Sequence, residues 1–274
     1  MRTILLTGAS SGIGAHTAML LAKQGHRVLA AARRINQIPH HPHITSLALD
    51  LTDGSSIERL VHSLQPTMNI DVLINCAGYG EFGSIEDTCS EHARQQMEVN
   101  VVGPMALTRA ILPRMRRAGR GRVVNVSSLA GEFAAPLGGW YHASKFALEA
   151  LSDSLRGEVA HHGIKVVIVQ PGYVDTDWHD DAMRRLDVAS SGGAYSDMAT
   201  AMRRYFKSAA VGRQMASADH VARTIVKAAT TARPKTRYRV GPGATLAVAL
   251  HTVLPDRTFD ALTRAQFRYP RVQA

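Results

Sequence analysis

Residues 3–14 read TILLTGASSGIG, and this stretch decides the fold. Its first five residues are apolar or β-branched, as in a buried strand, and a helical pattern begins at about Gly12. Gly8 suits the tight turn between them, Gly12 a close contact with phosphate, and Gly14 the packing of helix on strand. A pyrophosphate at such a turn is held by backbone N–H groups and the positive end of the helix dipole. The stretch therefore predicts a strand, turn and helix that bind a dinucleotide.

Apolar segments alternate with helical patterns along most of the chain, which is typical of a parallel sheet covered on both faces. The predicted strands are residues 3–7, 27–32, 44–49, 70–75, 121–127, 165–170 and 237–240. The predicted helices lie near residues 12–24, 55–64, 91–118, 141–161 and 218–232. Right-handed crossovers then give an α/β fold with a doubly wound seven-stranded parallel sheet, a Rossmann fold. One core of this kind is expected to form a single domain over residues 1–274.

Two segments interrupt the alternation of strands and helices. Residues 175–213 contain Met, Gly and Ser and are too long for an ordinary connection, so we expect a lid that selects the substrate. Residues 243–267 carry two short apolar helical patterns divided by Pro255. We expect this C-terminal segment to pack on the core or on another subunit, with peripheral membrane contact as the alternative.

The formal net charge of +10 is compatible with several anionic partners, namely nucleic acid, an acidic membrane surface, an acyl carrier or a phosphorylated cofactor. The basic residues are spread along the chain and match no nucleic-acid-binding motif, so no nucleic acid partner is expected.

The two cysteines, Cys76 and Cys89, are too few for a disulfide framework and lack the spacing of metal ligands. Residues 39–43 carry three histidines without a fourth ligand, which indicates an exposed loop and no metal site. We expect neither a signal peptide nor a membrane span, because the first strand begins at residue 3 and no apolar run reaches ~18 residues. These observations favour a cytoplasmic protein.

The second strand ends in residues 30–34, which read AAARR and contain no acid. A carboxylate at this place binds the adenosine ribose of NAD, whereas arginine forms charge-assisted bonds to the 2′-phosphate of NADP. We therefore predict NADP(H), with Arg33 as the main anchor and Arg34 as its helper. The alternative is that both arginines only solvate the strand end. Asp50, at the end of the third strand, is placed to accept a hydrogen bond from the adenine amino group.

Tyr141 and Lys145 are four residues apart on a predicted helix, so both project from one face. A free tyrosine titrates near ~10, and a neighbouring ammonium lowers that pKa toward the range useful for catalysis. Ser128, which we favour over Ser127, lies 13 residues before Tyr141 at the end of the fifth strand and could bond a substrate oxygen. Asn100 lies inside a helical pattern, where asparagine suggests a local polar task.

The motif set resembles the compact branch of the short-chain dehydrogenase/reductase family over about residues 3–240. It consists of Gly8-x-x-x-Gly12-x-Gly14, Asn75-Cys76-Ala77-Gly78, Asn100, Ser128, Tyr141-x-x-x-Lys145 and Pro171-Gly172. The tail after Tyr238 is similar to those of hydroxysteroid and retinol dehydrogenase-like members. Two positions depart from the pattern: Cys76 stands where a second asparagine is frequent, and His16 where a charged or polar residue is common.

This resemblance implies a role for each reacting group. Tyr141 would be the general acid/base, and Lys145 would bind the nicotinamide ribose and lower the tyrosine pKa. Ser128 would orient the substrate oxygen, and Asn100 would hold the water of a proton relay. The family also implies a homodimer or homotetramer built through the helices near residues 100–118 and 141–161.

The predicted sites follow from the motifs and the resemblance together. The cofactor-binding residues are Gly8, Ser10, Ser11, Gly12, Ile13, Gly14, Arg33, Arg34, Asp50, Leu51, Asn75, Ala77, Gly78, Tyr141, Lys145, Pro171, Gly172, Val174 and Thr176. The substrate-binding residues are Ser128, Trp140, Tyr173 and Trp178, and the apolar cleft is also expected to include Phe133, Leu137 and Met183.

The expected function is NADP(H)-dependent interconversion of a hydrophobic alcohol, such as a steroid, retinoid or lipid, and its ketone or aldehyde. One alternative is a 3-oxoacyl-carrier reductase that docks its acidic partner on the arginines of residues 114–122. Another is a binding protein that senses NADP(H) without catalysis.

Overall fold

A seven-stranded sheet forms the centre of the chain in a computed structural model that describes residues 1–190 and 192–267. Its strands are β1 (Thr3–Thr7), β2 (Arg27–Ala32), β3 (Ile44–Ala48), β4 (Val72–Asn75), β5 (Gly121–Val126), β6 (Ile164–Pro171) and β9 (Arg237–Val240). The order in space is β3-β2-β1-β4-β5-β6-β9, and all neighbours are parallel. The predicted doubly wound sheet is confirmed, and its strand bounds agree with the prediction within two residues.

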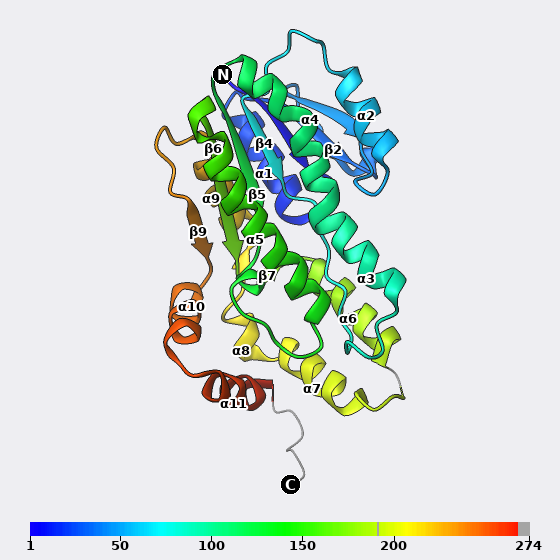
Figure 1. The fold of residues 1–274 in the computed structure, drawn as a ribbon. Coiled ribbons are helices and arrows are strands. Elements are labelled where there is room, and N and C mark those ends of the chain that lie inside the picture. The colour runs from blue at the N-terminus through cyan, green and yellow to red at the C-terminus, as the bar shows by residue number, and fades with distance from the viewer. Residues whose placement is uncertain (191, 268–274) are drawn as a thin grey trace.

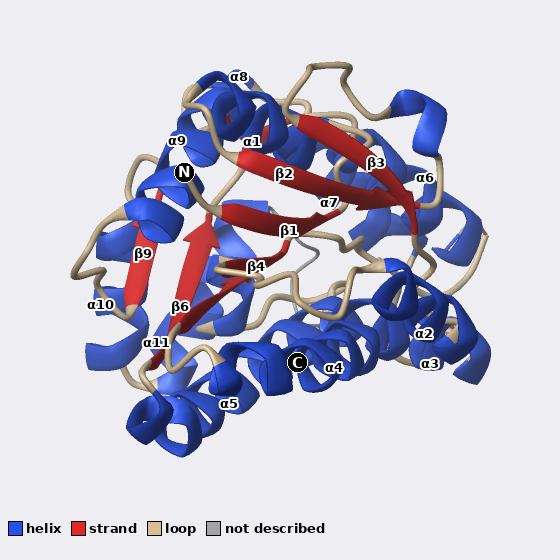
Figure 2. Ribbon diagram, turned by 90° about the horizontal axis from the view of Figure 1, so that it is seen from above, coloured by secondary structure: helices blue, strands red, loops and turns tan. Residues whose placement is uncertain are grey.

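Helices cover both faces of the sheet (Figure 2). The helices of the two layers are α1 (Gly12–Lys23) and α9 (Ala218–Thr230) on one face, and α2 (Gly54–Ser63), α4 (Gly103–Arg117) and α5 (Gly139–Val159) on the other. Short 3₁₀ turns lie at Ile35–Gln37, Leu129–Gly131 and Ala160–His162. The topology reverses beside β1, so a crevice is expected at the carboxyl ends of β1 and β4.

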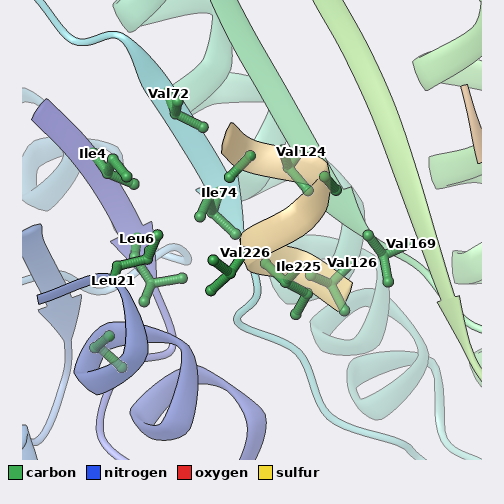
Figure 3. Close-up of a cluster of buried hydrophobic side chains, with 14 of the residues drawn as sticks. Ile4, Leu6, Leu21, Val72, Ile74, Val124, Val126, Val169, Ile225 and Val226 are labelled. Carbon is green, nitrogen blue, oxygen red and sulfur yellow. The ribbon is translucent and has the colours of Figure 1, made fainter. Parts of the chain in front are cut away.

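The core on the α1 and α9 side is built from the alternate side chains of the strands (Figure 3). Leu21 of α1 and Ile225 of α9 are fully buried against the sheet, where they meet residues such as Ile4, Ile74 and Val124. Burying each such side chain stabilises the fold by about 1.5–3 kcal/mol, so this layer fixes α1 and with it the glycine turn.

The prediction of a single helix over residues 91–118 is wrong, because the helix is not continuous. It is divided into α3 (Ser90–Met97), one π-helical turn (Glu98–Val102) and α4, which has Pro104 in its first turn. A π turn inserts a residue into the helical ladder and is frequent at functional sites. Asn100 lies in this turn.

The segment of residues 175–213 holds three helices that the sequence pattern did not reveal. They are α6 (Trp178–Ser190), α7 (Ser196–Phe206) and α8 (Ala209–Gly212). A second, two-stranded sheet joins β7 (Val174–Asp175) to β8 (Ala216–Ser217) and so closes this segment at its base. We refer to residues 175–213 as the insertion.

The C-terminal segment forms α10 (Ala244–Val253) and α11 (Asp256–Phe267), as the two patterns divided by Pro255 predicted. Figure 1 shows both helices at the same end of the molecule as α7 and α8. Phe267 is buried against Tyr205 and Phe206 of α7, whereas Leu246 and Val253 of α10 stay exposed. Within the described residues, no helix has the length and apolarity needed to cross a bilayer.

Candidate active site

A cleft of about 1160 Å³ opens at the carboxyl ends of the strands and is covered by the insertion and by α10 and α11. Most residues predicted for the two binding sites line this one cleft. They are Gly8, Ser10, Ser11, Gly12, Ile13, Gly14, Arg33, Arg34, Asp50, Leu51, Ala77, Gly78, Ser128, Tyr141, Lys145, Pro171, Gly172, Tyr173, Val174, Thr176 and Trp178.

The turn after β1 has no room for a side chain at Gly8 or Gly14. Gly8 has a φ of 72°, and a Cβ there would lie 2.8 Å from the backbone of Ala77. A Cβ on Gly14 would lie 2.1 Å from the carbonyl oxygen of Gly8. Only glycine at these two positions allows the turn to pack closely against β4 and α1. The backbone N–H groups at the start of α1 then face the cleft.

The end of β2 presents a positive charge to the same cleft. Arg33 and Arg34 line it and are exposed, and the strand end carries no acid. Asp50, across from them at the end of β3, accepts hydrogen bonds from the backbone and hydroxyl of Thr52 at 2.9 Å and 2.8 Å. This part of the cleft suits a phosphate better than a ribose hydroxyl pair that needs a carboxylate.

Tyr141 and Lys145 project into the cleft from one face of α5. The ammonium nitrogen of Lys145 lies 5.8 Å from the centre of the Tyr141 ring. The Ser128 hydroxyl lies beside them, donates to the carbonyl of Pro171 over 3.3 Å, and accepts from the backbone N–H of Ala130. A hydroxyl, a phenol and an ammonium thus meet where β5 and β6 end, which is a set suited to moving a proton onto or off a substrate oxygen.

The pKa values differ from the sequence expectation. Burial raises the pKa of Tyr141 to about 12, and a hydrogen bond with Ser128 opposes this shift. Burial also lowers the pKa of Lys145 to about 8, while the Cys76 thiol and the Glu149 carboxylate act in the other direction. The prediction of a lowered tyrosine pKa is therefore wrong, because removal of the phenol from water outweighs the hydrogen bond with Ser128.

Asn100 lies behind the cleft wall rather than on it. Its amide oxygen accepts from the backbone N–H of Tyr79 at 3.1 Å, and its amide nitrogen donates to the carbonyl of Tyr79 and to the hydroxyl of Ser144, each at 3.0 Å. A Cβ on Gly78 would lie 3.2 Å from the Asn100 oxygen and 3.6 Å from the Lys145 nitrogen. Asn100 therefore joins the end of β4 to α5 beside Lys145, and the π turn aims it there.

Besides Asn100, two predicted site residues do not line the cleft. Asn75 is buried beneath it, where its amide donates to Thr108 and Asn125 at 3.1 Å and 2.8 Å. Trp140 does not line the cleft, because it is rotated by about 100° from Tyr141 around α5. The structure thus places neither Asn75 nor Trp140 in the wall of the cleft, where direct contact with cofactor or substrate was expected.

The apolar half of the cleft differs in part from the expected one. Phe133, Tyr173 and Trp178 line it as predicted, but Leu137 and Met183 do not. Trp178 packs on Tyr141 with ring centres 5.1 Å apart, and Phe82 packs on both rings, with its centre 5.7 Å from that of Tyr141 and 6.0 Å from that of Trp178. The lining residues that sequence reasoning missed are Phe82, Met202, Phe206, Leu250, Phe259, Leu262 and Phe267.

The C-terminal helices supply four of these missed residues. Phe259 of α11 packs against Phe133 with ring centres 5.5 Å apart, and Leu250 and Leu262 are partly exposed at the edge of the same wall. The apolar pattern of the segment was visible in the sequence, but nothing in that pattern could say which surface it covers. Among the described residues, no group of three or more His, Cys, Asp or Glu could hold a metal ion.

Comparison with known proteins agrees with this geometry. The sequence model of the family described as short chain dehydrogenase matches residues 2–186. The chain is 35% identical over 243 residues to a 3-ketodihydrosphingosine reductase from Bacteroides thetaiotaomicron, and the match covers 87% of each protein.

Solved structures show the same fold. A short-chain dehydrogenase from Streptomyces avermitilis is 32% identical with a TM-score of 0.80, and the match covers 96% of each chain. A short chain dehydrogenase from Burkholderia cenocepacia, solved in complex with NADP, is 23% identical with a TM-score of 0.75, and the match covers 98% of this chain and 100% of that one.

Proposed function

This chain belongs to the short-chain dehydrogenase/reductase family, and we propose that it is an NADP(H)-dependent oxidoreductase that interconverts a hydrophobic alcohol and its ketone or aldehyde. One observation carries the proposal. Tyr141, Lys145 and Ser128 meet in a single cleft that has a glycine turn at one end and an aromatic wall at the other.

The cleft fits a nicotinamide dinucleotide. A Cβ added at Gly8 or Gly14 would clash with backbone atoms, and Gly8 and Gly12 have a positive φ. A backbone without side chains at these positions suits the close approach of a pyrophosphate. Arg33 and Arg34 favour NADP(H) over NAD(H), because an arginine bonds the 2′-phosphate and no acid follows β2. When bound, the nicotinamide would exchange a hydride with the substrate carbon.

The protein's own part in the reaction is proton transfer and orientation. In the reductive direction the Tyr141 hydroxyl gives its proton to the substrate oxygen, and the Ser128 hydroxyl donates a hydrogen bond to the same oxygen. The Lys145 ammonium favours the tyrosinate that is left and binds the nicotinamide ribose. The remaining lone pair of the Asn100 amide oxygen holds the water through which Tyr141 regains its proton, since both amide N–H groups already donate to Tyr79 and Ser144. We infer reduction as the working direction, because cellular NADP is mostly reduced.

The substrate is proposed to be lipid-like. The wall formed by Phe82, Phe133, Trp178 and Phe259 is apolar and can accept an alkyl chain or a fused ring system. A relative that is 35% identical bears the name 3-ketodihydrosphingosine reductase, which favours a long-chain ketone over a steroid or retinoid.

The alternative of a 3-oxoacyl-carrier reductase has less support. Its docking site was expected at the arginines of residues 114–122, but Arg114 donates to carbonyls after α2, including that of Gln65 at 2.7 Å. Arg122 is buried and donates to the carbonyls of Ala228 and Thr231 at the end of α9. Both lie near the start of β5, at the opposite end of the strand from the cleft.

We also propose a homodimer or homotetramer that forms through α4 and α5. Phe146 and Leu151 of α5 leave 43% and 41% of their surface exposed, and contact with a second subunit would cover this apolar surface. Analytical ultracentrifugation of the wild type and of Phe146→Asp tests this assembly. A wild-type monomer would contradict it.

The test of the function is oxidation of NADPH and of NADH over a panel of long-chain 3-oxo lipids, steroid ketones, retinal and 3-oxoacyl thioesters, with Tyr141→Phe as control. Turnover that prefers NADPH and a long-chain lipid, and that is lost in the variant, supports the proposal. Preference for the thioester supports the carrier alternative. Tight NADPH binding without turnover on any carbonyl supports the sensing protein instead.

A further inference from the structure

Arg185 of α6 is a cationic residue of the insertion that lies in the wall of the cleft. Its guanidinium lies over the ring of Tyr79, 4.7 Å from the ring centre, and donates to the carboxylate of Glu81 over 3.2 Å. Neither contact belongs to the reacting set around Tyr141. Arg185 thus joins the insertion to the loop after β4, as does Tyr195, whose hydroxyl donates to Glu86.

Glu81 fixes the position of this arginine. Its side chain is 3% exposed, and its second oxygen contacts the ring of His92 at 3.1 Å. Its backbone N–H donates to the amide oxygen of Gln96. A carboxylate this deeply buried needs a cationic partner, so Arg185 cannot leave it without a large cost in stability. Arg185 is therefore placed in advance by this ion pair, although 43% of its side chain is exposed.

Tyr79 is the neighbour that connects Arg185 to the cofactor end of the cleft. It also lines the cleft, and its hydroxyl is buried without a hydrogen-bond partner in the described part of the chain. Burial and the charge of Glu81 raise the pKa of this hydroxyl to about 12, while Arg185 and Arg33 both act to lower it. The tyrosine therefore lies within the electrostatic reach of an arginine that follows β2 and of one from the insertion.

The stretch after β4 is closely covered by the insertion. A Cβ on Gly80 would lie 2.6 Å from the indole of Trp178 at the start of α6. In the same wall Arg184 forms an ion pair with Asp181, so its charge is already neutralised by a residue of its own helix. Arg185 uses one nitrogen for Glu81, and a guanidinium has five N–H donors. Donors of Arg185 therefore remain for a ligand in the cleft that Arg33 also lines.

We propose that Arg185 is a further ligand for a phosphate group on the adenosine side of the dinucleotide, brought to the cleft by the insertion and positioned by Glu81. This inference rests on the proposed function. It gives the insertion a task beyond substrate selection, because its helix α6 would close on the phosphates of the cofactor opposite Arg33. The unpaired hydroxyl of Tyr79 supplies a second donor at the same place.

The experiment is calorimetric titration of the wild type, Arg185→Ala and Arg203→Ala with NADPH. Arg203 is the matched control, because it also lies in the insertion and pairs with an acid, Asp187, but does not line the cleft. We expect the Kd for NADPH to rise on the order of tenfold in Arg185→Ala and to change less than about twofold in Arg203→Ala.

Two smaller probes identify the phosphate. Loss of affinity for 2′-AMP in Arg185→Ala assigns the contact to the 2′-phosphate, and loss for ADP assigns it to the pyrophosphate. Because Arg185→Ala leaves Glu81 without its arginine, the double variant Arg185→Ala, Glu81→Gln is titrated beside it. Weak binding in the double variant separates a lost ligand from a misfolded insertion.

Two negative outcomes have different meanings. If the wild type binds NADPH and both Arg185 variants bind it equally well, Arg185 is no ligand and the proposed function stands. If the wild type binds neither NADPH nor NADH, the proposed function fails and this inference fails with it.

Discussion

The ammonium of Lys145 donates a hydrogen bond to the backbone carbonyl of Val126 over 3.1 Å and so ties α5 to the last residue of β5. The lysine is 6% exposed, and the carbonyl is its partner in place of water. Burial holds the pKa of Lys145 at about 8 even with this bond in place. The charge beside Tyr141 is thus poised to change close to physiological pH.

We expect kcat/KM for NADPH to fall as the pH rises above about 8, because the Lys145 ammonium then loses its proton. The pKa of Tyr141 is about 12, so the phenol stays protonated throughout this range and cannot cause the fall. This parameter reports the enzyme before NADPH binds. In Lys145→Arg the guanidinium keeps its charge, so the residual activity should show no such fall. A wild-type profile that stays flat to about pH 9.5 would contradict the assignment.

Gly14→Ala is expected to weaken both folding and cofactor binding, because the new Cβ would lie 2.1 Å from the carbonyl oxygen of Gly8. We expect a loss of more than about 2 kcal/mol in the free energy of unfolding. The matched control is Gly157→Ala in α5, where nothing lies within 4 Å. The free energy of unfolding of that variant should rise by roughly 0.5–1 kcal/mol, because alanine has a higher helix propensity than glycine. Urea titrations measure both, and equal effects would refute the steric reasoning.

The strand, turn and helix of residues 3–23 could be predicted from the sequence because their signals are local. β-Branching, three glycines and a helical period all lie within one stretch. The positions of Tyr141 and Lys145 follow equally well, since a spacing of four residues fixes one face of a helix. Trp140 was also expected in the cleft, although a side chain one residue before Tyr141 points about 100° away from it.

The walls of the cleft could not be predicted, because they form between segments that are distant in the chain. Phe133 meets Phe259 across more than 120 residues, and Glu81 meets Arg185 across 104. An apolar helical pattern says that one face will be buried but not against which partner. The prediction of a lowered pKa for Tyr141 was wrong for the same reason, because Phe82 and Trp178, which bury the phenol, are distant from it in the chain.

Arg33→Asp is expected to reverse the preference between the two cofactors. A carboxylate at this place repels the 2′-phosphate of NADPH and can bond the ribose hydroxyls of NADH. We expect the ratio of kcat/KM for NADPH to that for NADH to fall on the order of a hundredfold. The comparison variant is Arg34→Asp, whose effect should be smaller because Arg34 is the helper. If NADH is preferred by the wild type, Arg33 only solvates the end of β2.

Phe259→Ala tests whether the C-terminal helices form part of the substrate site. Phe259 packs on Phe133 in the wall of the cleft, so its loss removes apolar surface from a long-chain substrate. We expect KM for a ketone with a long alkyl chain to rise roughly tenfold, with kcat and the KM for a short-chain ketone little changed. The control is Val253→Ala on α10, which is 80% exposed and lies outside the cleft. Equal loss for long and short ketones would mean that α11 acts on stability and not on substrate choice.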